Sequence, residues 1–102
     1  MTVTPILEDA SLVGADRHAP LSERSLSKLR WRSRRGLLEN DLFIERFFNR
    51  HASSLSVGQA RGMYLLMDLS DNDLMDLLLR RKELQTEIST EEVLEVLNML
   101  RA

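Results

Sequence analysis

Three helix-start signals in the second half of the chain constrain its fold more than any other sequence feature. Each signal is a serine followed three residues later by glutamine or an acidic residue, and they lie at Ser56–Gln59, Ser70–Asp73 and Ser89–Glu92. In such a capping box the two side chains satisfy free amides at the start of a helix. Apolar residues at helical spacing follow each signal, so helices are expected after residues 56, 70 and 89.

The chain between Pro20 and Gly36 also follows a helical pattern. A first helix is expected to begin after Ser22, because serine is a favoured N-cap residue. Leu26 and Leu29 are expected on the inner side of this helix. The helix is predicted to end at Gly36, because glycine is common just after a helix.

A second helix is expected from Leu38 to about Arg50. Its apolar residues should form much of the core, and they are Leu42, Phe43, Ile44, Phe47 and Phe48. The third helix is expected to end near Leu69, and the fourth to run into the cations at residues 80–82. Nothing in the sequence reads as a strand. The predicted fold class is therefore all-α, a compact five-helix bundle with short connections.

The chain has 102 residues, which is enough for one domain with a single core. Residues 1–20 contain two prolines and a glycine without a clear helical period. They are therefore expected to form a flexible N-terminal segment, with the helical bundle in residues 21–102. The segment lacks a basic start followed by an apolar run, and no apolar stretch approaches the roughly 18 residues that span a membrane. A cytoplasmic protein without membrane insertion is expected.

The formal net charge of −2 conceals an uneven distribution. Six cations gather before Gly36, and they are Arg24, Lys28, Arg30, Arg32, Arg34 and Arg35. They either form a solvated face or use their guanidinium groups to contact carboxylates or phosphates. Four aspartates between residues 68 and 76 either cap a helix or form an acidic surface. Trp31 is interpreted as a core-edge residue, with stacking on a neighbouring guanidinium as the alternative.

The stretch from Arg34 to Asp41 joins the basic helix to the next one. Gly36 is expected to end the first helix, because glycine readily adopts the left-handed conformation found there. Glu39 and Asp41 suit the positive end of the second helix's dipole. These local roles leave Arg34 and Arg35 unexplained, so this corner is predicted to be a contact surface.

Residues 35–39, Arg-Gly-Leu-Leu-Glu, resemble the Arg-Gly-x-x-Glu signature of the SdhE family, also called succinate dehydrogenase assembly factor 2. Further residues fit the family pattern, and they are Trp31, Arg34, Asp41, Ile44, Phe47 and Phe48. Residues 66–74 resemble the family's acidic Asp-x-Asp-Leu segment. The resemblance covers about residues 21–80, and Asn40 departs from it because the family commonly has an apolar residue there.

The resemblance implies an assembly factor that promotes covalent flavinylation of the flavoprotein subunit of succinate dehydrogenase or fumarate reductase. It also implies that a histidine of the partner bonds to the 8α carbon of FAD. Neither the nucleophile nor a stably bound cofactor would then belong to this chain, which would act by positioning. The predicted partner-binding residues are Trp31, Arg34, Arg35, Gly36, Glu39 and Asp41.

The residues themselves indicate no catalytic, metal-binding or cofactor-binding site. The chain has no cysteine, and His18 and His51 lack a third ligand at metal spacing. No Gly-x-Gly-x-x-Gly turn follows a strand. Two other functions remain open, an antitoxin-like regulatory module and a nucleic-acid binder that uses the basic helix. The net negative charge argues against the second, and a monomer or weak homodimer is expected.

Overall fold

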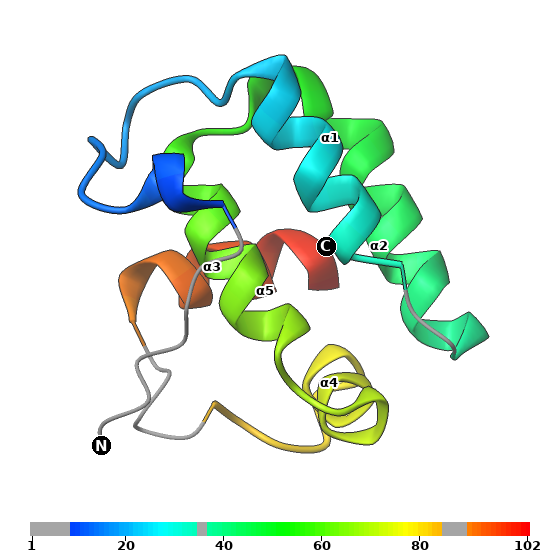
Figure 1. Cartoon of the computed structure of the whole chain (residues 1–102). Helices are drawn as coiled ribbons and strands as arrows, with labels where there is room; N and C mark the ends of the chain where they lie inside the picture. The colour runs from blue at the N-terminus through cyan, green and yellow to red at the C-terminus, as the bar shows by residue number, and fades with distance from the viewer. Residues whose placement is uncertain (1–8, 35–36, 85–89) are drawn as a thin grey trace.

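The computed structural model describes residues 9–34, 37–84 and 90–102. Within these ranges the chain forms five α-helices and two short 3-10 helices, and an isolated bridge pairs Pro20 with Ser56. The elements are η1 (Ala10–Leu12), α1 (Glu23–Arg32), α2 (Leu38–His51), η2 (Ala52–Ser54), α3 (Val57–Met67), α4 (Asp71–Leu78) and α5 (Glu91–Arg101). Figure 1 shows the helices packed into one bundle. The prediction of an all-α fold with five helices is confirmed.

Two of the helix-start signals form the caps that the sequence predicts. At the start of α3, the amide of Gln59 donates to the Ser56 hydroxyl at 3.2 Å, and the Ser56 amide donates to the Gln59 side chain at 3.0 Å. At the start of α4, the amide of Asp73 donates to the Ser70 hydroxyl at 3.2 Å. These reciprocal or single bonds satisfy amides that have no partner inside the helix.

The third signal caps its helix one residue later than its serine. The Thr90 hydroxyl accepts from the Val93 amide at 3.2 Å, so Thr90 is the N-cap of α5. Ser89 lies outside the described residues. In the first half of the chain Ser22 is the N-cap of α1, as predicted, and its hydroxyl accepts from the Ser25 amide.

Helix α1 ends four residues before the glycine that was predicted to end it. Its last residue is Arg32, and Gly36 lies outside the described residues. Ser33 follows the helix and is fully buried. Its amide and its hydroxyl both donate hydrogen bonds to the Leu29 carbonyl, at 2.9 and 2.7 Å. A serine side chain can thus donate a hydrogen bond to a carbonyl of the last helical turn and end the helix without a glycine.

Helix α4 also stops earlier than predicted. It ends at Leu78, and the three cations of residues 80–82 lie beyond it. Arg80 has a φ of 62°, a left-handed conformation that residues other than glycine and asparagine rarely adopt. The amide of Arg81 then donates to the Asp76 carbonyl at 2.8 Å. This reversal ends α4, so the prediction that the helix runs into the cations is wrong.

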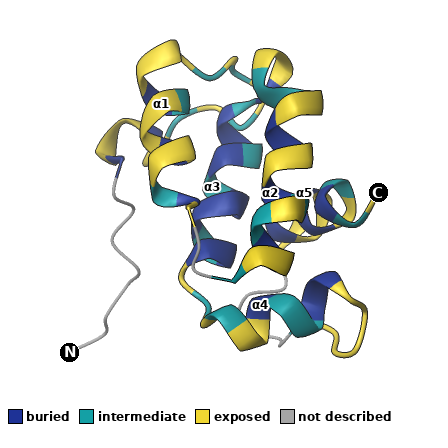
Figure 2. Ribbon diagram, turned by 90° about the vertical axis from the view of Figure 1, so that its right-hand side faces the viewer, coloured by how far each residue is buried: buried dark blue, intermediate teal, exposed yellow. Residues whose placement is uncertain are grey.

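Helix α3 lies at the centre of the bundle against α1 and α5. Figure 2 shows α3 largely buried, whereas α1 and α2 carry exposed outer faces. Gly62 makes the contact with α5 possible, because a Cβ at this position would overlap the backbone carbonyl of Glu92. We call α3, α5 and this contact the α3–α5 base.

Much of the predicted core of α2 is confirmed, with one exception. Ile44, Phe47 and Phe48 are buried, and Phe43 is partly buried against the core. Leu42 is 59% exposed, so its assignment to the core is wrong. Leu38 and Leu42 lie four residues apart on the outer side of α2, away from the face that packs on the other helices.

Residues 9–20, expected to be part of a flexible segment, pack on the bundle in this structure. The Leu12 side chain is only 2% exposed and belongs to the core. The carbonyls of Arg17 and Ala19 accept from the amides of Gly58 and Val57, at 3.0 and 2.9 Å. Residues 1–8 lie outside the described residues, and flexibility of residues 1–20 in solution stays a prediction.

The Arg61 guanidinium joins this N-terminal segment to the α3–α5 base. It contacts the Glu92 carboxylate at 2.7 Å and donates to the carbonyls of Leu12 and Ala15 at 3.0 and 2.8 Å. Both charged side chains are largely buried, with 18% and 21% of their surface exposed. One side chain of α3 therefore holds both α5 and residues 12–15.

Asp9 anchors the beginning of the described chain. The Ser11 hydroxyl and amide both donate to one Asp9 carboxylate oxygen, at 2.6 and 3.1 Å, and Ser25 of α1 adds to the cluster. Burial raises the pKa of Asp9, but these hydrogen bonds outweigh it, so the pKa lies below its ordinary value of 3.8. The cluster links η1 to α1.

Candidate partner-docking site

An open groove of about 750 Å³ separates the outer faces of α1 and α2. It is lined by Ser27, Arg30, Trp31, Ser33, Arg34, Asp41, Ile44, Glu45 and Phe48. Three of the six predicted partner-binding residues, Trp31, Arg34 and Asp41, therefore meet at one feature. We call this end of the bundle, residues 27–34 and 37–48, the docking tip.

Trp31 does not lie at the core edge, and that interpretation is wrong. Its side chain is 74% exposed, and the Arg34 guanidinium lies 5.7 Å from the centre of its ring. The cause is the helical period, because Leu29 faces the core and Trp31 follows it by about 200° around the axis. The alternative, stacking on a neighbouring guanidinium, is confirmed, and it presents a large aromatic surface to solvent.

The two walls of the groove carry opposite charges. Arg30 stands on α1 and Arg34 just after its end, whereas Asp41 and Glu45 stand on α2. Apolar surface lies between them, where the Arg30 guanidinium sits 5.4 Å from the centre of the Phe48 ring. A partner segment in this groove would therefore meet donors on one wall, acceptors on the other and an apolar floor.

Two exposed leucines extend the apolar surface of the docking tip. Leu38 and Leu42 lie one turn apart at the start of α2, and both are exposed. Isolated exposed apolar residues are ordinary, but these two share the docking tip with the exposed Trp31 ring. Such a combination of aromatic, aliphatic and guanidinium groups is typical of protein-binding surfaces.

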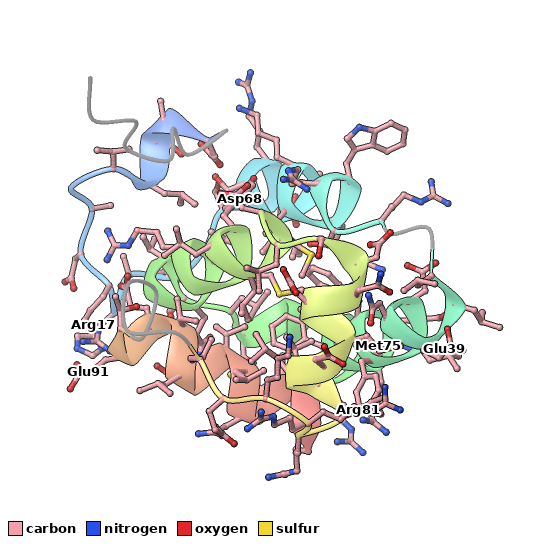
Figure 3. The ribbon with its side chains drawn as sticks, turned by 90° about the horizontal axis from the view of Figure 1, so that it is seen from below. Arg17, Glu39, Asp68, Met75, Arg81 and Glu91 are labelled. Carbon is pink, nitrogen blue, oxygen red and sulfur yellow. The ribbon has the colours of Figure 1, made fainter. Side chains whose placement is uncertain are left out.

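Glu39 and Asp41 occupy different positions although both lie in the first turn of α2. Asp41 is partly buried at the groove, whereas Glu39 is exposed and does not line it. Figure 3 shows Glu39 pointing outward, on the opposite side of the molecule from the paired Arg17 and Glu91. Arg35 and Gly36, the first two signature residues, lie outside the described residues, so their predicted roles stay predictions.

The sequence prediction missed several residues of the docking tip. Arg30 and Glu45 line the groove, and each lies four residues from a predicted site residue, which is Arg34 just after α1 in one case and Asp41 of α2 in the other. Residues four apart lie on one helical face, so this spacing was an available signal. Leu38 and Leu42 show the same spacing but were assigned to the signature and to the core.

Two contacts flank the signature segment, and both reach the connection between α3 and α4. Before the signature, the Arg32 guanidinium binds the Asp68 carboxylate at 3.0 Å. After it, the Asn40 side-chain amide donates to the Asp71 carbonyl at 2.9 Å. The acidic segment that the sequence singled out is therefore adjacent to both ends of the predicted docking corner.

A metal site requires a cluster of ligands, and a membrane-spanning helix requires a long apolar stretch. They contain no cluster of three or more histidine, cysteine or carboxylate groups placed to hold a metal ion. His51 instead packs against Phe47, with ring centres 5.4 Å apart. Among the helices of residues 9–34, 37–84 and 90–102, none is long and apolar enough to cross a membrane.

Comparison with known proteins adds independent information about these residues. Residues 27–101 match a protein-family model described as the flavinator of succinate dehydrogenase. The matched range begins inside α1 and contains all six predicted partner-binding residues. Residues 9–20, which pack on α3, lie before it.

Three curated proteins are similar to the chain. The FAD assembly factor SdhE of Ralstonia nicotianae is 53% identical over 76 residues, which cover 74% of this chain and 80% of that protein. Succinate dehydrogenase assembly factor 2, a mitochondrial protein of Dictyostelium discoideum, is 31% identical over 83% of this chain and 61% of its own length. The SdhE protein of Coxiella burnetii is 40% identical over 51% of this chain and 63% of its own length. No solved structure matches the chain.

Proposed function

The chain belongs to the family of succinate dehydrogenase flavinators, and from that membership we propose that it is an FAD assembly factor. It binds the flavoprotein subunit of succinate dehydrogenase and promotes the covalent attachment of FAD to that subunit. The single observation that supports a binding role is the docking tip, where Trp31, Arg34 and Asp41 surround one groove with oppositely charged walls.

In this proposal the chain acts through position and charge. The partner supplies the histidine that bonds to the 8α carbon of FAD, and this chain supplies no nucleophile. The groove accepts a segment of the flavoprotein, and the exposed Trp31 ring and the arginines beside it hold that segment. Fixing the flavoprotein in one conformation accelerates the bond by orienting groups that are already present.

Four finer points belong to the same proposal. The flavoprotein of fumarate reductase is a second partner, because the resemblance of the signature covers both enzymes. The chain holds no FAD of its own between encounters. It works in the cytoplasm without binding nucleic acid. It is a monomer or weak homodimer, and self-association through the exposed docking tip would compete with the flavoprotein.

Co-expression with the flavoprotein tests the proposal. Covalent flavin is measured by in-gel fluorescence, with this chain present or absent and with Arg34→Ala, Gly36→Arg and Glu39→Ala. The control is Glu83→Ala, because Glu83 is exposed and lies outside the docking tip. We expect flavinylation to need the chain, to fall in the three tip variants and to be unaffected in the control.

Two results would contradict the proposal. If the flavoprotein acquires covalent FAD equally with and without the chain, the assembly function is wrong. If the three folded tip variants all match the wild type, the docking site is elsewhere. Capture of an unrelated protein in place of the flavoprotein would favour the antitoxin-like alternative.

A further inference from the structure

Asn40 stands within the docking tip, yet its side chain is hidden from any partner. It is 0% exposed and lies in the first turn of α2, between the outward-pointing Glu39 and the groove residue Asp41. Its side-chain amide nitrogen donates to the Asp71 carbonyl of α4. Its side-chain oxygen is buried and accepts no hydrogen bond from the described residues.

This arrangement is a poor device for stability alone. A buried polar atom without a partner costs free energy, so an apolar side chain of similar size would suit this position at least as well. The Asp71 carbonyl does not depend on Asn40 either, because a carbonyl in the first turn of a helix accepts from the amide four residues later. The bond instead fixes the orientation of the first turn of α2 relative to the start of α4.

The first turn of α2 also lacks the side-chain cap that usually holds the start of a helix in place. Its N-cap is Leu37, whose side chain makes no capping hydrogen bond. The starts of α1, α3, α4 and α5 all have a serine or threonine cap. The partly buried bond from Asn40 to the Asp71 carbonyl therefore ties the first turn of α2 to α4.

The second contact that flanks the signature is weaker. The Arg32 side chain is 26% exposed and its partner Asp68 is 52% exposed. Exposed ion pairs of this kind contribute little and are screened by salt. Asn40 is then the more buried of these two links between the docking tip and the acidic connection from α3 to α4.

We infer that Asn40 is a positioning residue for flavoprotein docking. Its amide holds the first turn of α2 on α4, so that Glu39 and Asp41 are presented in one fixed arrangement beside the acidic segment. The flavoprotein then binds a surface that is already ordered, without the cost of ordering it. This inference rests on the proposed function.

The test compares Asn40→Leu and Asn40→Ala with the wild type. Both variants lack the donor, but leucine fills the site and alanine leaves a cavity, so their stabilities differ. We expect both to bind the flavoprotein about tenfold more weakly, as expected for one lost hydrogen bond. We also expect faster hydrogen exchange at the amides of the first turn of α2 in both variants. Flavoprotein affinity and covalent flavin are the binding readouts.

Two control variants separate positioning from general damage. Asn49→Leu makes the same chemical change at an exposed position of α2, and it should bind like the wild type. Val96→Ala removes buried volume in α5, outside the docking tip, and should lower stability without changing exchange at the start of α2.

Each outcome decides the inference. It is overturned if Asn40→Leu and the wild type bind the flavoprotein equally, or if affinity across all four variants simply follows their stability. A wild-type chain that neither binds nor assists the flavoprotein would instead overturn the proposed function, and the inference with it.

Discussion

The α3–α5 base and the docking tip both belong to one small helical bundle, but their side chains face different surroundings. At the base, Gly62 brings α3 against the backbone of Glu92, and Arg61 closes the contact with a largely buried ion pair. At the docking tip, Trp31 and Leu38 face solvent, and α2 begins without a side-chain cap. From this difference we expect substitutions at the base to change mainly stability, and substitutions of exposed residues at the docking tip to change mainly docking.

The largest expected effect is at the base, from Gly62→Ala. A Cβ there would overlap the Glu92 carbonyl, and because the obstacle is backbone it cannot move aside cheaply. We expect the free energy of unfolding to fall by about 2–3 kcal/mol, despite the better helix propensity of alanine. Urea denaturation followed by circular dichroism measures it.

Gly58→Ala is the matched control for this change. Its Cβ would lie 2.8 Å from a Glu92 side-chain oxygen, 2.9 Å from the Arg17 Cβ and 3.0 Å from the Arg17 carbonyl oxygen, and each of these approaches is longer than that of a Gly62 Cβ to the Glu92 carbonyl oxygen. The loss should therefore be smaller than for Gly62→Ala. Equal stability of Gly62→Ala and the wild type would remove the main structural contrast between base and tip.

At the docking tip, Trp31→Ala should have the reverse profile. The ring is largely exposed, so the free energy of unfolding should change by less than about 0.5 kcal/mol. Flavoprotein affinity should fall at least about tenfold, because exposed tryptophans on binding surfaces commonly dominate the binding energy. Calorimetric titration with the flavoprotein measures it, and Leu94→Ala, an exposed apolar residue of α5, serves as the control. A Trp31 variant that unfolds but binds normally when folded would reverse the comparison.

Arg80, which lies outside both regions, offers a smaller and stabilising change for comparison. Arg80 has a left-handed backbone at the end of α4, which costs an arginine about 1 kcal/mol relative to glycine. We expect Arg80→Gly to raise the free energy of unfolding by about 0.5–1 kcal/mol, since glycine also loses more entropy on folding. Arg81→Gly, at a neighbour without positive φ, should give no gain. A thermal melt compares the two variants.

The smallest expected effect is a pH dependence of the stability, caused by Asp9 in the cluster that joins η1 to α1. Its pKa is lowered in the folded chain, so the ionised carboxylate stabilises the fold above the ordinary value of 3.8. This contribution is lost as the pH falls through the lowered pKa. Wild-type stability should therefore approach that of Asp9→Asn below pH 3.8, and exceed it at neutral pH. Denaturation curves at several pH values measure the gap, and a gap that widens on acidification would contradict the assignment.

Helix starts and much of the core could be predicted from sequence, because the signals are local. A serine and a glutamine three residues apart specify the cap of α3, and Phe47 faces inward by spacing alone. The resemblance to a family could likewise be read without a structure, and the family match confirms the family.

The docking tip was harder to predict because it depends on how two helices are rotated against each other. Trp31 was assigned to the core edge, but Leu29 lies on the face of α1 that packs on the core, and Trp31 lies on the opposite face. Leu42 was assigned to the core, but the packing of α2 turns it outward. The end of α1 was missed because a buried serine, an ordinary loop residue by type, returns its hydroxyl to the helix. The helical period of α1 already places Trp31 outward, but the rotation of α2 against its neighbours is not contained in a pattern within one helix.

The carbonyls that Arg61 binds have a consequence for how this protein is defined. They belong to Leu12 and Ala15, yet the range matched by the family model begins at residue 27. A fragment cut to that range would keep every signature residue and lose four residues of α1 together with two partners of a largely buried guanidinium. The range matched by the family model is thus shorter than the stretch that packs as one bundle, and a boundary drawn from that range alone would separate Arg61 from two of its partners.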